Sequence, residues 1–193
     1  MRITVEKMGL LALTLIPGMA LAHPGHEHTS SFLSGLIHPL TGLDHLLAMF
    51  AIGLWATSLG GRSLTLVPTM FVAVMLLGAG AAMLGMNVPF IESGILLSVI
   101  LMGALLLSAK RLPLTASIAI AGTFAIFHGA AHGMEMPLNA NGFEYGLGFA
   151  LATIALHLVG IGTGRMLQSL NLTRLNQVGG AAISLAGVSL VFA

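Results

Sequence analysis

Six apolar runs follow one another along this chain, separated only by brief polar connections. About 20 helical residues cross the hydrocarbon core of a bilayer, so each run is long enough for one transmembrane helix. The composition agrees, with 56% hydrophobic and 7% charged residues. We therefore predict an all-α fold, a polytopic membrane helix bundle in which residues 35–193 form one domain of six transmembrane helices. Their expected positions are residues 35–59, 64–86, 90–109, 112–134, 143–167 and 176–193.

A separate apolar segment precedes these runs. Arg2 and Lys7 stand before a stretch that ends in Ala-Leu-Ala at residues 20–22, the small-x-small pattern that signal peptidase cleaves. We expect residues 1–22 to be a cleavable signal peptide, with an uncleaved anchor helix as the alternative. Residues 23–34 would then form an external, histidine-rich N-terminal tail.

The basic residues indicate how the bundle is oriented. The connections at residues 87–89 and 135–142 contain no Lys or Arg, whereas the alternate connections are basic. Cytoplasmic loops of membrane proteins carry an excess of Lys and Arg, so we expect both termini outside. The basic residues of the expected mature chain are Arg62, Lys110, Arg111, Arg165 and Arg174.

Several classes of site are excluded by composition. The chain has no cysteine, which rules out thiolate metal sites and disulfides. No G-x-x-x-x-G-K-[ST] element is present, so nucleotide is not an expected partner. The net charge of +1 gives no indication of nucleic-acid binding. Membrane lipid and a metal ion bound through nitrogen and oxygen remain as partners.

The first polar motif, HPLTGLDH at residues 38–45, lies where the first apolar run begins. Ionisable side chains in such a position are costly and usually functional. We expect Pro39 to be the first helical residue, with His38 at the cap. On an unbroken helix His38 and His45 would lie roughly 10 Å apart, which is long for two ligands of one ion.

The second motif, HGAAHGMEMP at residues 128–137, ends the fourth run. His128 and His132 are one helical turn apart and share a face, the spacing with which two imidazoles chelate one ion. The predicted topology puts both motifs outside, where they can meet. The alternative is an Asp–His pair that only locks two helices together. We expect one shared metal site, with Asp44, His45, His128 and His132 at its centre and His38 and Glu135 around them.

Other polar residues stand outside the two motifs. The expected mature chain begins HPGHEH, which suggests metal capture at the mature N-terminus, although a merely polar tail is the alternative. The histidines of that tail are His23, His26 and His28. His157, in the fifth run, is either a second station for the ion or a packing residue. Glu92 and Glu144, at the external ends of their runs, are interpreted as solvated carboxylates rather than cation attractors.

The pattern H-x5-D-H at residues 38–45, followed by HGxxHGxE at residues 128–135, resembles the HupE/UreJ family of nickel permeases associated with hydrogenase and urease maturation. The similarity covers the signal segment, the His-bearing tail, the short-looped spans and both motifs. It implies a multi-pass protein of the bacterial inner membrane that transports Ni²⁺, or Co²⁺ as in some members. The transport residues that it implies are His38, Asp44, His45, His128, His132 and Glu135.

These features together predict a transporter rather than an enzyme. The transported ion is expected to be Ni²⁺, with Co²⁺ and Zn²⁺ as alternatives, because imidazole and carboxylate ligands suit all three. No prosthetic group is expected, and downstream metallochaperones are the expected recipients. The leading alternative is an intramembrane zinc hydrolase using the same Asp/His cluster, although the chain has no H-E-x-x-H element. A haem-binding electron carrier ranks third, and a di-iron oxygenase lower still.

Overall fold

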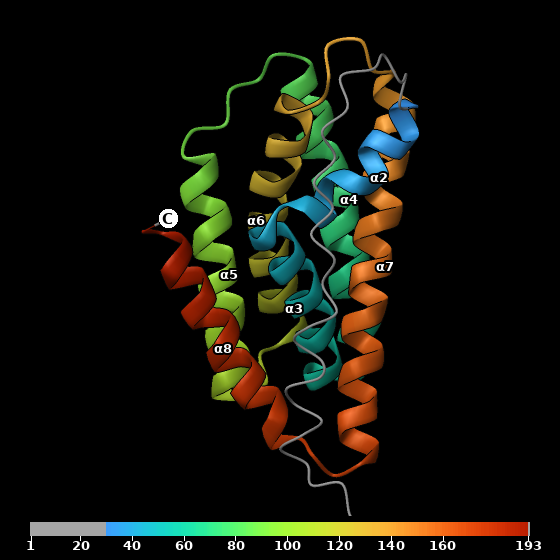
Figure 1. The fold of residues 1–193 in the computed structure, drawn as a ribbon. Coiled ribbons are helices and arrows are strands. Elements are labelled where there is room, and N and C mark those ends of the chain that lie inside the picture. The colour runs from blue at the N-terminus through green and yellow to red at the C-terminus, as the bar shows by residue number, and fades with distance from the viewer. Residues whose placement is uncertain (1–29, 193) are drawn as a thin grey trace, which may run out of the picture.

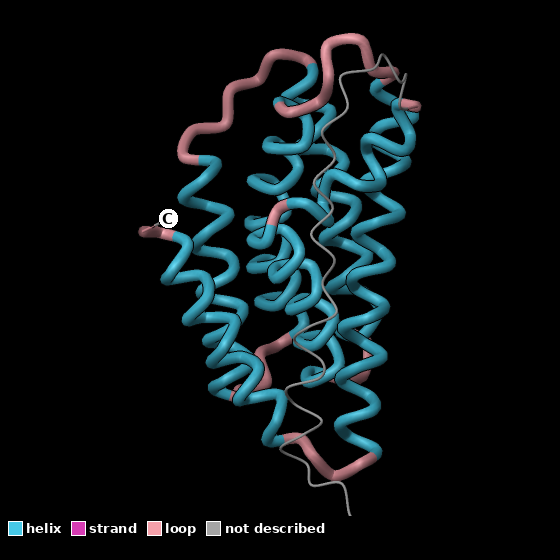
Figure 2. The backbone as a smooth tube through the Cα atoms, in the orientation of Figure 1, coloured by secondary structure: helices cyan, strands magenta, loops and turns pink. Residues whose placement is uncertain are grey.

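The computed structural model describes residues 30–192, which form seven α-helices connected by short loops (Figure 1). That part of the chain contains no β-strand, which confirms the all-α prediction (Figure 2). The expected signal peptide and His23, His26 and His28 lie outside the described residues. The helices are α2 (Ser31–Thr41), α3 (Leu43–Leu59), α4 (Ser63–Met83), α5 (Ile91–Ser108), α6 (Leu114–Met134), α7 (Gly142–Ser169) and α8 (Arg174–Leu190).

Four helices are long and apolar enough to cross a membrane, namely α4, α5, α6 and α7. The bent pair α2 and α3 passes the same test when it is counted as one span, which brings the number to five. The remaining helix, α8, has 17 residues. The protein is therefore an all-helical bundle with several helices of membrane-spanning length and composition.

Helix α3 lies at the centre of the bundle and every residue from 51 to 57 is buried. A helix that is apolar all round can be buried on every side, which explains why α3 is central. The most extensive pairings are α4 with α6, α5 with α8, and α2 and α3 with α7 (Figure 1). Helix α4 also packs against α3 and α7, and α6 against α5, so α6, which carries the second motif, is fixed from two sides.

The first predicted span is broken at Gly42, where α2 and α3 meet at 83°. The prediction that Pro39 starts a single helix was wrong, because Pro39 lies inside α2. Two local features accompany the break. The Thr41 hydroxyl donates to the His38 carbonyl at 2.8 Å and so satisfies a group that a continuing helix would bond to the Gly42 amide. Gly42 itself is extended, and a Cβ there would stand 2.8 Å from Asp44 Oδ1.

Glycines let the helices that carry the motifs approach backbone to backbone. A Cβ on Gly129 of α6 would collide with the Met75 carbonyl oxygen of α4. A Cβ on Gly35 of α2 would likewise collide with the Tyr145 carbonyl oxygen of α7. Small residues allow such close contact between transmembrane helices. They bring α2 and α6 to fixed positions on the two sides of the cluster described below.

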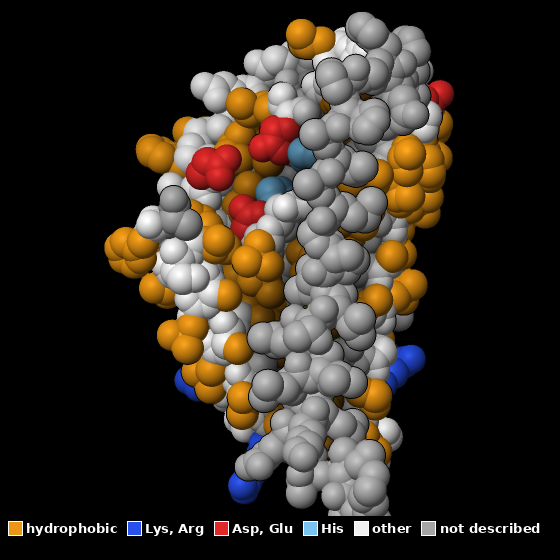
Figure 3. Space-filling view, viewed as in Figure 1, with side chains coloured by type: hydrophobic (Ala, Val, Ile, Leu, Met, Phe, Trp, Pro, Cys, Tyr) orange, Lys and Arg blue, Asp and Glu red, His pale blue; other side chains and the backbone are white. Residues whose placement is uncertain are grey.

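Charged residues separate toward the two ends of the bundle. Figure 3 shows Lys and Arg toward one end, while acidic residues and histidines gather around a hollow nearer the other end. The α3–α4, α5–α6 and α7–α8 connections lie at the first end, which we call the basic end. The α4–α5 and α6–α7 connections lie at the opposite end, the histidine end.

Candidate metal site

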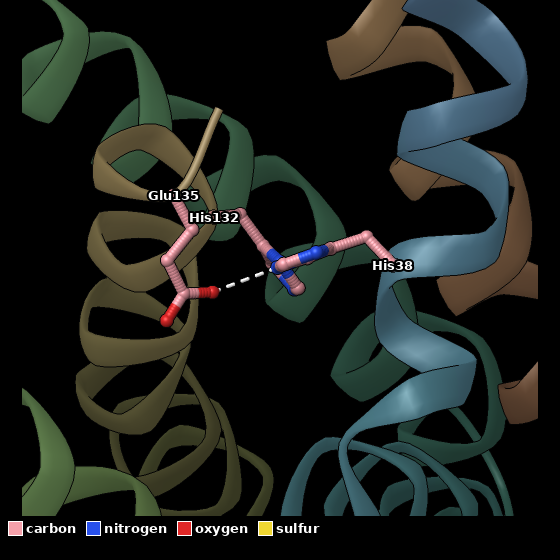
Figure 4. Close-up of side chains that lie close together, drawn as sticks. All are labelled: His38, His132 and Glu135. Atoms are coloured by element: carbon pink, nitrogen blue, oxygen red, sulfur yellow. Dashed lines mark hydrogen bonds and ion pairs between the residues drawn. The ribbon is translucent and has the colours of Figure 1, made fainter. Parts of the chain in front are cut away.

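The two polar motifs meet at the histidine end although they are far apart in sequence. His38 on α2 donates from Nε2 to Oε2 of Glu135 at 2.7 Å, across a separation of 97 residues (Figure 4). An ionised carboxylate only accepts hydrogen bonds, so the proton belongs to the imidazole. Helix α2 and the C-terminal end of α6 thus contribute side chains to one polar cluster.

Among the described residues, His38, His132 and Glu135 form a set of potential metal ligands, which we call the outer donor group. Each offers a ligand atom, and these atoms all lie within 4.8 Å of one another. Ligand atoms around one transition-metal ion lie about 3–4 Å apart, since each is about 2 Å from the ion. Small side-chain movements would therefore suffice to enclose a cation.

The arrangement differs from the sequence expectation, which set His38 and Glu135 around a centre made by other residues. That expectation assumed an unbroken helix through residues 38–45. The bend at Gly42 turns α2 so that the His38 ring lies 5.0 Å from the His132 ring, measured between centroids. His38 and Glu135 therefore belong to the donor group itself.

Two further ring contacts define a second group, the inner imidazoles His45, His128 and His132. The His45 ring centroid lies 4.8 Å from that of His128 and 4.7 Å from that of His132. Buried ring nitrogens without a hydrogen-bond partner in the described structure are His45 Nε2, His128 Nδ1 and both nitrogens of His132. Buried polar atoms are normally paired, so these nitrogens are suited to a ligand that completes them. His132 belongs to both groups and joins them.

Asp44 holds His45 in a defined orientation. Its Oδ1 accepts from the His45 backbone amide at 2.7 Å and from His45 Nδ1 at 2.9 Å. With the proton on Nδ1, the lone pair of His45 lies on Nε2, which is buried and has no hydrogen-bond partner in the described structure. A carboxylate that accepts from the far nitrogen of a histidine raises the basicity of the ligand and fixes its tautomer. The geometry therefore gives Asp44 a positioning role.

Ser98 of α5 does the same for His128, and sequence reasoning missed it. The Ser98 hydroxyl donates to the Ile95 carbonyl at 2.6 Å, so its oxygen accepts from His128 Nε2, 2.9 Å away. The lone pair of His128 is then on the unpartnered Nδ1. In the sequence Ser98 is one serine in an apolar run, and nothing local shows that α6 brings an imidazole to it.

Replacing Ser98 by alanine should weaken Ni²⁺ binding about tenfold, because loss of a partner that orients a metal-binding histidine typically costs 10–100-fold in affinity. Ser98→Thr keeps the hydroxyl and should retain most of the binding. Equilibrium dialysis of the purified full chain measures both. Ser117→Ala is the control, since Ser117 is equally buried but bonds only to the Pro113 carbonyl. Equal affinities for the Ser98→Ala variant and the parent would contradict the orienting role.

A pocket of about 330 Å³ opens the cluster to the surface, and we call it the mouth pocket. Glu92, interpreted from sequence as merely solvated, is among the residues around it. Its described lining contains three carboxylates and two imidazoles but no Lys or Arg. The lining residues are His38, Thr41, Gly42, Asp44, His45, Glu92 and Glu135.

Exposure falls steadily from the mouth pocket inward. The exposed fraction of the side chain is 46% for Glu135, 27% for His38 and 10% for His45, and His132 is fully buried. The hydrogen bond from His38 lowers the pKa of Glu135, so this carboxylate is ionised at neutral pH. The arrangement can attract a hydrated cation and then replace its water with imidazoles.

His157 lies apart from both groups. It is on α7 and 2% exposed, and its ring centroid is 5.4 Å from that of Phe71. Glu144 is at the start of α7 and does not line the mouth pocket. The two motifs thus converge, while His157 lies outside both groups.

Comparisons with known proteins place these motifs in a family. The family described as HupE / UreJ protein matches residues 11–190, which include both motifs and all seven described helices. Protein HupE of Rhizobium leguminosarum bv. viciae is 40% identical over 185 residues, covering 94% of each chain. No solved structure matches this chain significantly. As the two motifs predicted, this chain belongs to the HupE/UreJ family.

Proposed function

We propose that this protein takes up Ni²⁺ from the periplasm across the bacterial inner membrane and supplies it for hydrogenase or urease maturation, with Co²⁺ as the alternative ion. The observation that carries the proposal is the cluster itself. Helices α2, α3 and α6 bring imidazoles and carboxylates together in a chain of the HupE/UreJ family. Such ligands suit Ni²⁺, Co²⁺ and Zn²⁺.

The proposal includes a topology with six spans, in which α2 and α3 together form the first and α8 the last. A helix of 17 residues is at the short end of the range that crosses a bilayer. The histidine end faces the periplasm and the basic end the cytoplasm, in keeping with the positive-inside rule. A cleaved signal peptide at residues 1–22 places the mature N-terminus on the periplasmic side.

Uptake begins in the mouth pocket, where Asp44, Glu92 and Glu135 concentrate cations. The outer donor group then takes the ion, and His132 passes it to His45 and His128. A membrane potential of 100 mV contributes about 2.3 kcal/mol per charge, hence about 4.6 kcal/mol for a dication moving inward. That is enough to drive accumulation without a nucleotide.

Uptake of radiolabelled Ni²⁺ by vesicles reconstituted with the purified protein tests the proposal. We expect saturable uptake that grows with an inside-negative potential. Competition by Co²⁺ and Zn²⁺ at graded concentrations ranks the three ions. Vesicles that take up no more Ni²⁺ than protein-free vesicles, at any potential, would overturn the proposal.

The N-terminal tail should matter mainly when metal is scarce. A tail carrying His23, His26 and His28 would capture ions and raise their concentration near the mouth pocket. Deleting residues 23–28 should therefore reduce cellular Ni²⁺ accumulation several-fold at low external metal and little at high metal. An equal loss at both concentrations would contradict a capture role.

A further inference from the structure

His157 is a fully buried imidazole that neither motif includes. Both of its ring nitrogens are buried and lack a hydrogen-bond partner in the described part of the chain. The nearby Thr153 hydroxyl, one turn earlier on α7, is directed to the Met75 sulfur at 3.8 Å instead. Leaving polar atoms unpaired at this depth is costly, which suggests that His157 is kept for a ligand.

The ring of Phe71 on α4 neighbours both His157 and one of the inner imidazoles. Its ring centroid lies 5.7 Å from that of His128 on one side and 5.4 Å from that of His157 on another. The Phe71 side chain is 1% exposed. Five rings are therefore linked by successive contacts, and four of them are imidazoles. In order they are His132, His45, His128, Phe71 and His157.

A proline in α4 and a pocket beside His157 lie close to this contact in the chain. Pro68 lies inside α4, nearly one turn before Phe71, and the missing amide proton weakens the helix there. A pocket of about 470 Å³, open to the outside of the bundle between α4 and α7, borders both Pro68 and His157. Its other described lining residues are aliphatic or threonine side chains of α4 and α7, so His157 is its one imidazole.

We propose that His157 is an inner binding station for the same divalent transition-metal ion and that Phe71 is the hydrophobic barrier in front of it. This inference rests on the proposed transport function. Hydrophobic constrictions close a path by excluding water. Mg²⁺ gives up its water reluctantly, whereas Ni²⁺ and Co²⁺ bind imidazole readily. The barrier therefore stops hydrated ions, and movement of Phe71 lets a partly dehydrated ion pass from His128 to His157.

Separate measurements of binding and uptake test the station. In the His157→Ala and His157→Gln variants we expect equilibrium binding of Ni²⁺ within about twofold of the parent, but uptake by vesicles at least about tenfold slower. Ser117→Ala, which removes a buried hydroxyl away from the histidines, is the control. Unchanged uptake in both variants would make His157 a packing residue. Loss of binding together with uptake would put His157 in the motif cluster, and either result overturns the proposal.

The barrier can be tested without transport, because the chain contains no cysteine. His157→Cys introduces a single thiol. A small cationic thiosulfonate is added on the side of the histidine end, and the rate at which it labels the thiol is measured. With Phe71 in place we expect slow labelling, and adding Phe71→Ala should speed it at least about tenfold by admitting water. Phe71→Leu keeps the apolar bulk and should remain slow. Met102→Ala, a buried truncation on α5, is the packing control.

Equal labelling rates with and without Phe71→Ala would overturn the barrier. Ni²⁺ added before the reagent should slow labelling in the Phe71→Ala background, since the thiol is itself a metal ligand. Labelling that Ni²⁺ does not affect would overturn the station. If the parent protein transports no Ni²⁺, these labelling results still stand by themselves, so failure of the inference and failure of the proposed function are distinguishable.

Discussion

Replacing His132 by alanine should abolish Ni²⁺ binding and uptake together, by about 100-fold or more, because even partners that only orient ligands are worth 10–100-fold. His132 belongs to the outer donor group and also lies 4.7 Å from the His45 ring, between ring centroids. Removing it separates the His38–Glu135 pair at the mouth from the inner imidazoles. Equilibrium dialysis and vesicle uptake on the same preparation measure the two losses.

The loss should not come from unfolding. Neither His132 nitrogen has a hydrogen-bond partner in the described structure, so the substitution leaves no buried group newly unpaired. It does remove the stacking of the His132 ring on Phe149, at 4.9 Å between centroids. Met102→Ala, a buried truncation on α5 that removes no polar group, controls for such packing loss. A His132→Ala protein that binds and transports within about twofold of the parent would refute the shared role.

Substituting Asp44 should give the second largest effect. Asp44→Ala removes both hydrogen bonds that hold His45, so its ring can turn and change tautomer. We expect Ni²⁺ affinity to fall about 10–100-fold, the usual cost of losing such a partner. Asp44→Asn should be intermediate, because the amide oxygen can accept the same bonds but carries no charge. Equilibrium dialysis measures both affinities.

Glu144→Gln is the matched control for Asp44. Glu144 is also an acidic residue in the first turn of a helix at the histidine end, but it does not line the mouth pocket. Its replacement should leave affinity within about twofold of the parent, since an exposed distant charge is screened by salt. Equal losses for the two residues would mean that net negative charge, and not the hold on His45, supports binding.

Much of the architecture could be predicted from local patterns. Apolar runs of membrane-spanning length gave the helices, because the backbone of such a segment must satisfy its own hydrogen bonds in lipid. The i, i+4 spacing of His128 and His132 put both rings on one face of α6, as helical geometry requires. Both rings do reach the cluster, where each lies near His45.

The bend at Gly42 could not be predicted from local sequence patterns. A glycine and a threonine in an apolar run are common in unbroken membrane helices, so HPLTGLDH predicts a helix start equally well. What selects the break is the packing of α2 against α7, where Gly35 meets the Tyr145 backbone. Glu92 illustrates the same limit, because it becomes part of the mouth pocket only when α5 stands beside α2 and α6.

The sequence by itself determined the helical class, the alternation of basic and non-basic connections, the family, and which residue types are available as ligands. These follow from composition and from periodicity over a few turns. Only the tertiary structure decided that His38 and Glu135 join His132, that Ser98 orients His128, and that Phe71 packs against His157. The reason is that these relations join residues on different helices, and each depends on the packing and bending of whole helices rather than on any local pattern.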